Sequence, residues 1–239
     1  MKHKTVGIIC AMDIELQGFK DKLENLEVKV FLNHEFYVGD YLENTLVITK
    51  CGIGKVNAAA ICLLLIENFH PDILFNSGIA GGYGKSLKTL DIVVAEQLVY
   101  SDFDMTSDAF SNLRYGQIEF FPLTFKTDET IVNKIKELNN KDNIYFGTIA
   151  TGDQFVTNYD KVDMIVNNYF SDLNVLAFDM ESCAIAHVCY LTKTKVLVIK
   201  SISDIIGSTN AFDYGAFAPI AAKNATDLVN FIIKEIKEI

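Results

Sequence analysis

The chain has 239 residues, half of them apolar and 22% charged, which is enough to bury the core of one sizeable globular domain. Its net charge of −10 argues against binding nucleic acid or an anionic membrane, because either partner would need a broad basic surface. No apolar run approaches the ~20 residues of a membrane span. The apolar run that ends at Met12 is short for a signal peptide, and no small-residue cleavage site follows it.

Strand-type segments alternate with helical segments along the chain. We predict strands over residues 6–10, 28–32, 35–42, 45–50, 73–76, 92–100, 144–150, 173–177 and 195–199. We predict helices over residues 13–25, 56–69, 127–139, 159–169, 180–190 and 212–236, with Pro219 a candidate break in the last one. The first helix should turn Ile14, Leu16, Phe19 and Leu23 inward. The alternation predicts one α/β domain over residues 1–239.

Five cysteines are present, and none has the spacing of a CxxC motif or of a Cys/His metal site. Most of them lie in apolar segments, so we interpret them as small buried core residues. This usage suits a reducing compartment, and we expect a cytoplasmic protein. The four histidines form no ligand-spaced set, so the sequence predicts neither a metal nor an organic cofactor.

Three acidic residues follow strand-type segments closely. Glu15 comes soon after the first strand, and Glu181 and Asp204 follow two later ones. Side chains at the carboxyl ends of strands in an open α/β sheet point into the crevice where such folds bind ligands. Acidic side chains without a nearby arginine favour a neutral, hydroxyl-rich ligand, with which they can exchange protons. They are a poor pattern for binding phosphate. Simpler interpretations stay open, since Glu181 could pair with a helix dipole and Asp204 could be a helix N-cap.

Two glycine-containing segments and one aromatic residue are further candidates. Gly52–Gly54 opens a helix after a strand, which is a weak signal for a dinucleotide site and equally consistent with a tight turn. Asn76–Gly82 contains three glycines, which would let the backbone approach a ligand. Phe155 could stack on a flat base or could belong to the core.

Six motifs in register resemble those of the bacterial 5'-methylthioadenosine/S-adenosylhomocysteine nucleosidases, in the wider nucleoside phosphorylase superfamily. The resemblance spans residues 5 to about 236. The motifs are Ala11–Glu15, Cys51–Val56, Asn76–Gly82, Thr151–Phe155, Asp179–Glu181 and Ser203–Asp204. The resemblance implies a twisted central mixed sheet, partly closed and flanked by helices. It also implies hydrolysis of the N-glycosidic bond of methylthioadenosine and S-adenosylhomocysteine, in methionine salvage and removal of S-adenosylmethionine by-products.

The same resemblance assigns roles to individual residues. Asp204 would be the general acid that protonates adenine N7, with a pKa raised by burial, and Ser203 could orient it. Glu15 would activate the water that adds to C1'. The resemblance places the remaining candidates around the substrate: Met180 and Glu181 at the ribose, Ala80 and Gly81 beside ribose and adenine, Phe155 and Val156 at the adenine, and Ile53 and Phe212 at the 5'-substituent.

The aromatic-rich stretch 101–126 is longer than an ordinary connection and is typical of a functional or interface loop. The resemblance implies a homodimer in which Met105 crosses to the partner's pocket. This loop is also where the chain departs most from its relatives in length. Ile79 stands where many relatives carry Ser or Thr, and Asp13-Ile14 replaces an acidic pair.

Two rival functions are consistent with the same scaffold. A purine nucleoside phosphorylase would bind phosphate through arginines, but Arg114 is the only arginine in the chain, so we favour water as the nucleophile. A lysine could substitute. A non-catalytic nucleoside-binding module is the second rival, and the presence of all three acids argues against it. The sequence does not rank methylthioadenosine, S-adenosylhomocysteine, 5'-deoxyadenosine and aminofutalosine-like compounds as substrates.

Overall fold

The computed structural model describes residues 3–84, 86–110, 112–208 and 210–235, with the backbone alone for residues 210–213. Its strands are β1 Thr5–Cys10, β2 Glu24–Phe31, β3 His34–Tyr41, β4 Asn44–Lys50, β5 Ile73–Gly82, β6 Ile92–Tyr100, β7 Phe125–Lys126, β8 Ile144–Thr151, β9 Val175–Asp179 and β10 Val196–Ile205. Its α-helices are α1 Asp13–Lys20, α2 Lys55–Phe69, α3 Glu129–Leu138, α4 Tyr159–Tyr169, α5 Ser182–Thr192 and α6 Asn210–Glu235. One 3₁₀ turn covers Asp108–Phe110.

The strands of the described residues form one mixed sheet in the order β10-β6-β8-β9-β5-β1-β4-β3-β2, with β7 beside β6. An additional parallel pairing joins β10 to β5. Strands β5, β10, β6, β8 and β9 therefore close into a ring, and β1 to β4 extend from it as an open sheet. The predicted α/β class and partly closed sheet are confirmed.

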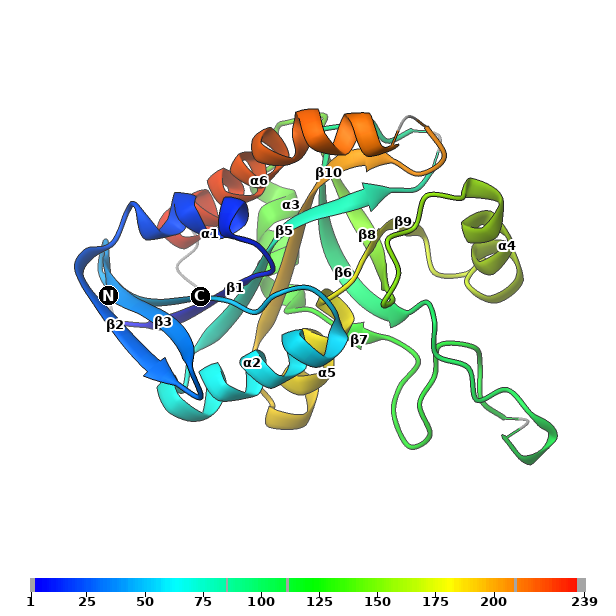
Figure 1. The fold of residues 1–239 in the computed structure, drawn as a ribbon, viewed down its shortest axis with the longest axis horizontal. Helices are drawn as coiled ribbons and strands as arrows, with labels where there is room; N and C mark the ends of the chain where they lie inside the picture. Colours follow the sequence, from blue (N-terminus) through cyan, green and yellow to red (C-terminus); the bar gives the residue numbers. More distant parts are fainter. Residues whose placement is uncertain (1–2, 85, 111, 209, 236–239) are drawn as a thin grey trace.

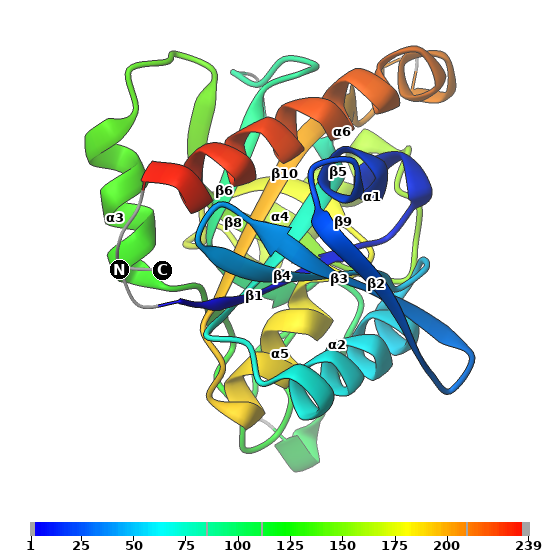
Figure 2. The same cartoon turned by 90° about the vertical axis from the view of Figure 1, so that its left-hand side faces the viewer.

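Helices cover both faces of this sheet (Figures 1 and 2). Helices α1 and α6 lie on one side, and α2 and α5 lie together on the other. The central strands are apolar on both faces, which is typical of sheets buried between helices. Along β1, for example, Ile8 packs with the core under α6, whereas Ile9 packs with the core under α2 and α5. Among the described helices, none is long and apolar enough to cross a membrane.

Two predicted boundaries near the N-terminus are wrong. The helix predicted to reach residue 25 ends at Lys20, and β2 begins at Glu24 instead of near Val28. β2 begins with the polar, exposed residues Glu24 and Asn25, so its start carries no apolar signal that would reveal a strand. Asn25 has a positive φ of 51°, which the short polar side chain of asparagine tolerates. Ile14, which we expected to face inward, is 45% exposed.

Two strands that carry functional motifs extend further than predicted. β5 continues from Ile73 through the glycine-containing motif to Gly82, and β10 continues from Val196 to Ile205. Each supplies the other with hydrogen-bonding partners over this extension, which is why neither ends where its apolar run ends. The small residues of β5 leave room for this pairing and for the pocket beside it. Helix α6 runs through Pro219, the candidate break, without ending there.

Candidate active site

One pocket lies where the carboxyl ends of β1, β5, β9 and β10 meet the amino-terminal ends of α2 and α5. It encloses about 590 Å³ of space, including solvent at its mouth. Ten of the residues predicted from the sequence line it: Glu15, Ile53, Ala80, Gly81, Phe155, Val156, Met180, Glu181, Ser203 and Asp204.

Glu15, in the first turn of α1, is buried, and three backbone amides hold its carboxylate. Oε2 accepts hydrogen bonds from Ala11 N at 2.8 Å and Met12 N at 3.0 Å, and Oε1 accepts one from Ile79 N at 2.9 Å. Burial raises the pKa of Glu15, while Lys200 and these amides oppose the rise. A Cβ at Gly78 would lie 2.4 Å from Oε1, so only glycine leaves the carboxylate this position. Oε1 has one amide partner, which leaves acceptor capacity for a water molecule.

Asp204 is buried near the end of β10, where the β5–β10 register shifts between Ile202 and Asp204. Such a bulge re-aims side chains relative to the regular alternation of a strand. Ile202 packs in the core, whereas Asp204 lines the pocket. Ser203 Oγ donates to Asp204 Oδ1 at 2.7 Å, which supports the predicted orienting role of Ser203. Since Asp204 lies within a strand, the alternative that it is a helix N-cap is wrong.

Glu181 occupies the N-cap position of α5 and makes no side-chain capping bond to that helix. Its Oε1 instead accepts a hydrogen bond from Gly54 N at 3.0 Å, in the turn before α2. Burial raises the pKa of Glu181 to about 7, with Lys200 opposing the rise and the nearby Asp179 adding to it. The carboxylate therefore serves the pocket more than the dipole of its own helix.

Lys200, which the sequence analysis did not single out, is a cation that acts on both Glu15 and Glu181. It is fully buried on β10, with Nζ 3.1 Å from Asp179 Oδ2 and 4.0 Å from Glu181 Oε2. Burial lowers the pKa of Lys200, but the carboxylates of Asp179, Glu181 and Glu15 outweigh burial and raise it overall. The sequence signal was a single lysine directly after the apolar run of β10, which is easily taken for the solvent-exposed end of a strand.

The pocket wall also contains Met12 and Tyr214, which were not predicted. Tyr214 contacts Phe155 edge to face, with ring centres 5.5 Å apart, and its hydroxyl donates to Met12 Sδ at 3.5 Å. Phe155 is 57% exposed, so the interpretation that it belongs to the core is wrong. Its ring is available to stack on a flat ligand.

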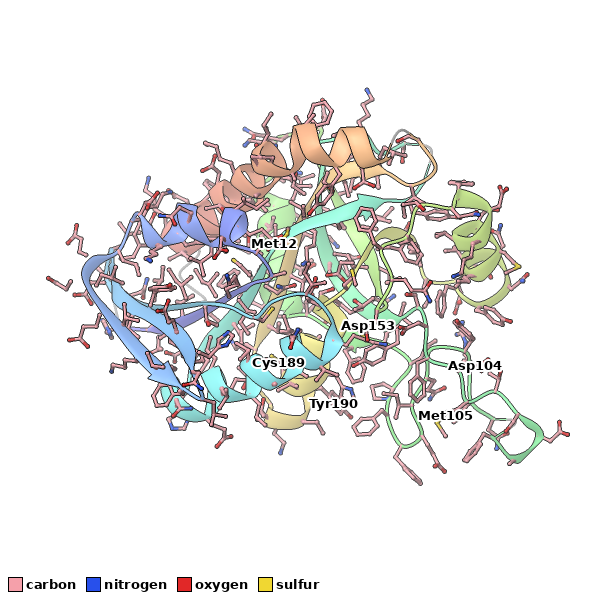
Figure 3. All side chains as sticks on the ribbon, in the orientation of Figure 1. Met12, Asp104, Met105, Asp153, Cys189 and Tyr190 are labelled. Carbon is pink, nitrogen blue, oxygen red and sulfur yellow. The ribbon has the colours of Figure 1, made fainter. Side chains whose placement is uncertain are left out.

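Two predicted residues are not placed in this pocket. Phe212 lies in the first turn of α6, and its side chain falls outside the described residues. Met105 does not line the pocket of its own chain. Figure 3 shows it on the irregular segment between β6 and β7, away from Met12. Its predicted place in a partner's pocket stays a prediction.

The cysteines and Arg114 do not line this pocket. All five cysteines are free and buried, as predicted. Among the described residues, no group of three or more His, Cys, Asp or Glu side chains could hold a metal ion. Arg114 forms an exposed ion pair with Asp172 at 2.7 Å, and it does not line the pocket.

Residues 5–234 match the model of the phosphorylase superfamily, so the chain belongs to this superfamily. Within it, curated relatives named 5'-methylthioadenosine/S-adenosylhomocysteine nucleosidase align along nearly the whole chain. The relative from Bacillus subtilis (strain 168) is 36% identical over 234 residues, covering 97% of this chain and 99% of its own. The relative from Bacillus licheniformis is 37% identical over 235 residues, with the same coverage. The chain belongs to the family of 5'-methylthioadenosine/S-adenosylhomocysteine nucleosidases.

Solved structures of this family superpose closely on the chain. The nucleosidase from S. pneumoniae, solved with the transition-state inhibitor MT-ImmA, has a TM-score of 0.90 at 34% identity, covering 96% of this chain and 98% of that one. The nucleosidase from Colwellia psychrerythraea, solved in complex with adenine, has a TM-score of 0.89 at 34% identity, covering 97% and 95%.

Proposed function

We infer that the protein hydrolyses the N-glycosidic bond of 5'-methylthioadenosine and S-adenosylhomocysteine, releasing adenine and the 5'-substituted ribose. The observation that carries this inference is the pairing of Glu15 and Asp204 in one pocket, each buried and each held by specific hydrogen bonds. Family membership supports the choice of substrates. We further propose that 5'-deoxyadenosine is a substrate and that the protein acts in the cytoplasm.

The reaction needs one proton donor and one base. Asp204 gives a proton to N7 of adenine. The base then takes the electron pair of the breaking N-glycosidic bond and leaves as neutral adenine. The ribose becomes cation-like, and Glu181 and Met180 bind it. A water held by Glu15 Oε1 adds to C1', and the proton it loses passes to Glu15. Phe155 stacks on the adenine, Val156, Ala80 and Gly81 lie beside it, and Ile53 and Phe212 contact the 5'-substituent.

The charges of the pocket favour water over phosphate as the nucleophile. Lys200 is the cation that acts on both Glu15 and Glu181, and Asp179 neutralises it at 3.1 Å. Glu181 and Glu15 add two further carboxylates around it. A phosphate dianion would therefore enter a site with excess negative charge, whereas neutral water would not. This removes Lys200 as a substitute for the arginines of a phosphorylase.

A substrate comparison tests the proposal. Purified protein is supplied separately with methylthioadenosine, S-adenosylhomocysteine and 5'-deoxyadenosine, and adenine is measured by chromatography. We expect adenine from the first two at kcat/KM values typical of enzymes, about 10⁴ M⁻¹s⁻¹ or above. Binding of these nucleosides without any adenine release would instead support the non-catalytic binding module.

The activity should depend on pH through Glu181, whose pKa is raised to about 7 mainly by burial. The ionised carboxylate is the better acceptor for ribose hydroxyls, and its fraction increases as the pH rises through about 7. We expect kcat/KM for methylthioadenosine to rise between about pH 6 and about pH 8. The Glu181→Gln variant should have lower kcat/KM throughout and should lack this rise. A variant that keeps the same rise would show that another group titrates.

We also propose that the protein is a homodimer. The outer faces of α2 and α5 expose apolar side chains, and Phe120 in the irregular segment is 91% exposed. Figure 1 shows α2, α5 and this segment on the same side of the molecule. Helices that are apolar nearly all round are normally covered, and contiguous exposed apolar patches mark interfaces. The exposed side chains on the two helices are Val56, Leu63, Tyr190 and Leu191. The partner's Met105 would complete the 5' end of each pocket.

Analytical ultracentrifugation at about micromolar concentration tests the dimer, since obligate assemblies persist under such dilution. We expect a dimer mass. Met105→Asp should impair methylthioadenosine cleavage more than it alters the circular dichroism spectrum, because a charge would enter an apolar part of the pocket. A monomer mass with full activity would contradict the proposal.

A further inference from the structure

Two carboxylates from other segments of the pocket wall hold the amino-terminal end of α2. Gly54 precedes this helix, has a φ of 97° that favours glycine, and has no side chain to cap the helix. Gly54 N donates to Glu181 Oε1 at 3.0 Å, and Lys55 N donates to Asp153 Oδ1 at 2.8 Å. Asp153 thus caps α2 from 98 residues away in the sequence. Figure 3 shows Asp153 beside this end of the helix.

The side chain of Lys55 adds a second connection between the start of α2 and the segment that contains Asp153. Its Nζ lies 2.6 Å and 2.7 Å from the two carboxylate oxygens of Asp102 and 3.7 Å from Asp153 Oδ2. Asp153 N in turn donates to Asp102 Oδ2 at 2.8 Å. The side chains of Lys55 and Asp102 are only 22% and 20% exposed, so solvent screens this pair less than an ordinary surface ion pair. We call Lys55, Asp102 and Asp153 the Lys55 cluster.

A lysine at the first position of a helix is unfavourable for the helix itself. The amino-terminal end carries a partial positive charge, which stabilises acidic side chains and destabilises basic ones. The first turn of α2 contains no acidic residue to offset Lys55. A residue that conflicts with its local preference often serves a tertiary or functional requirement. Here the compensation comes from Asp102 and Asp153, which lie far away in the sequence.

We propose that Lys55 is a positioning residue of the active site. The Lys55 cluster connects two segments of the pocket wall. One is the turn that contains Ile53 and Gly54, and the other is the segment that contains Phe155. Ile53 and Phe155 both line the pocket, and both are more than half exposed, so packing alone holds them only weakly. With the cluster intact, the two side chains keep one relative position and Gly54 N stays on Glu181. The inference rests on the proposed function, because it concerns how the nucleoside is held.

Steady-state kinetics of Lys55→Met with methylthioadenosine tests this role. Methionine keeps the length and apolar stem of lysine but removes the charge. We expect KM to rise about tenfold while kcat changes by less than about threefold, because the lost contacts hold ground state and transition state alike. Lys55→Arg should restore most of the affinity. Asp102→Asn should resemble Lys55→Met, and the double variant should lose less than the sum of the two single losses, since the two residues share a contact.

Lys136→Met is the matched control, because Lys136 on α3 pairs with Glu96 at 2.5 Å outside the pocket. It should leave KM unchanged. An unchanged KM in both Lys55→Met and Asp102→Asn would overturn the proposal. So would losses that follow the thermal unfolding temperature and are equally large in Lys55→Arg, since these indicate a structural role. Turnover by the unmodified protein in the same assay tests the proposed function separately from the effect of Lys55.

Discussion

Asp204→Asn and Glu15→Gln should each lower kcat for methylthioadenosine by about 10²–10⁴, the usual loss when a positioned acid or base is removed. Asparagine at position 204 keeps the shape of the side chain but has no acidic proton to give to adenine N7. Glutamine at position 15 has one carbonyl oxygen, whereas the carboxylate of Glu15 accepts bonds from Ala11, Met12 and Ile79 through both oxygens. The amide therefore loses an anchor as well as its basicity.

Adenine release under saturating substrate measures both effects, and circular dichroism checks that the fold is kept. Asp142→Asn and Glu129→Gln are matched controls, because both residues are exposed and neither lines the pocket. They should retain full activity. Turnover close to that of the unmodified protein in Asp204→Asn would remove this residue from the role of acid, and the same result in Glu15→Gln would remove Glu15 from the role of base.

Lys200→Met should lower the free energy of unfolding by about 3–5 kcal/mol, the usual cost of removing one partner of a buried ion pair. The reason is that Asp179, Glu181 and Glu15 would remain buried without their shared cation. Chemical denaturation at pH 7 measures the loss. The deficit should shrink at lower pH, because protonation removes the uncompensated negative charges.

Lys134→Met is the control for this prediction, since Lys134 forms an exposed ion pair with Glu137 on α3. Its loss should be within about 1 kcal/mol, as for surface ion pairs in general. A similarly small loss in Lys200→Met, or a deficit that grows as the pH falls, would contradict the charge balance described for the site.

The sequence predicted the alternation of strands and helices well, because apolar periodicity records burial directly. Its failures have physical causes. β2 begins with two polar, exposed residues, so its start gives no apolar signal. β5 and β10 extend past their apolar runs because they pair with each other, and such pairing depends on closure of the sheet. Asp204 was therefore expected after a strand and lies within one.

The candidate site was predicted largely through its acids and its motifs, and the resemblance supplied their roles. Glu15, Glu181 and Asp204 do meet in one pocket. Lys200 was missed because its burial depends on carboxylates from α1, β9 and the start of α5, which no local pattern brings together. Tyr214 was missed because a single aromatic residue in a helix is far more often part of the core. The contribution of Met105 depends on a second copy of the chain.

Product analysis in the absence of phosphate tests the central claim most directly. The protein is dialysed free of phosphate, incubated with methylthioadenosine in a zwitterionic buffer, and the sugar product is identified by mass spectrometry. We expect full conversion to adenine and free methylthioribose, with the same rate and products when phosphate is added. Turnover that requires phosphate and yields a sugar 1-phosphate would contradict the hydrolytic function.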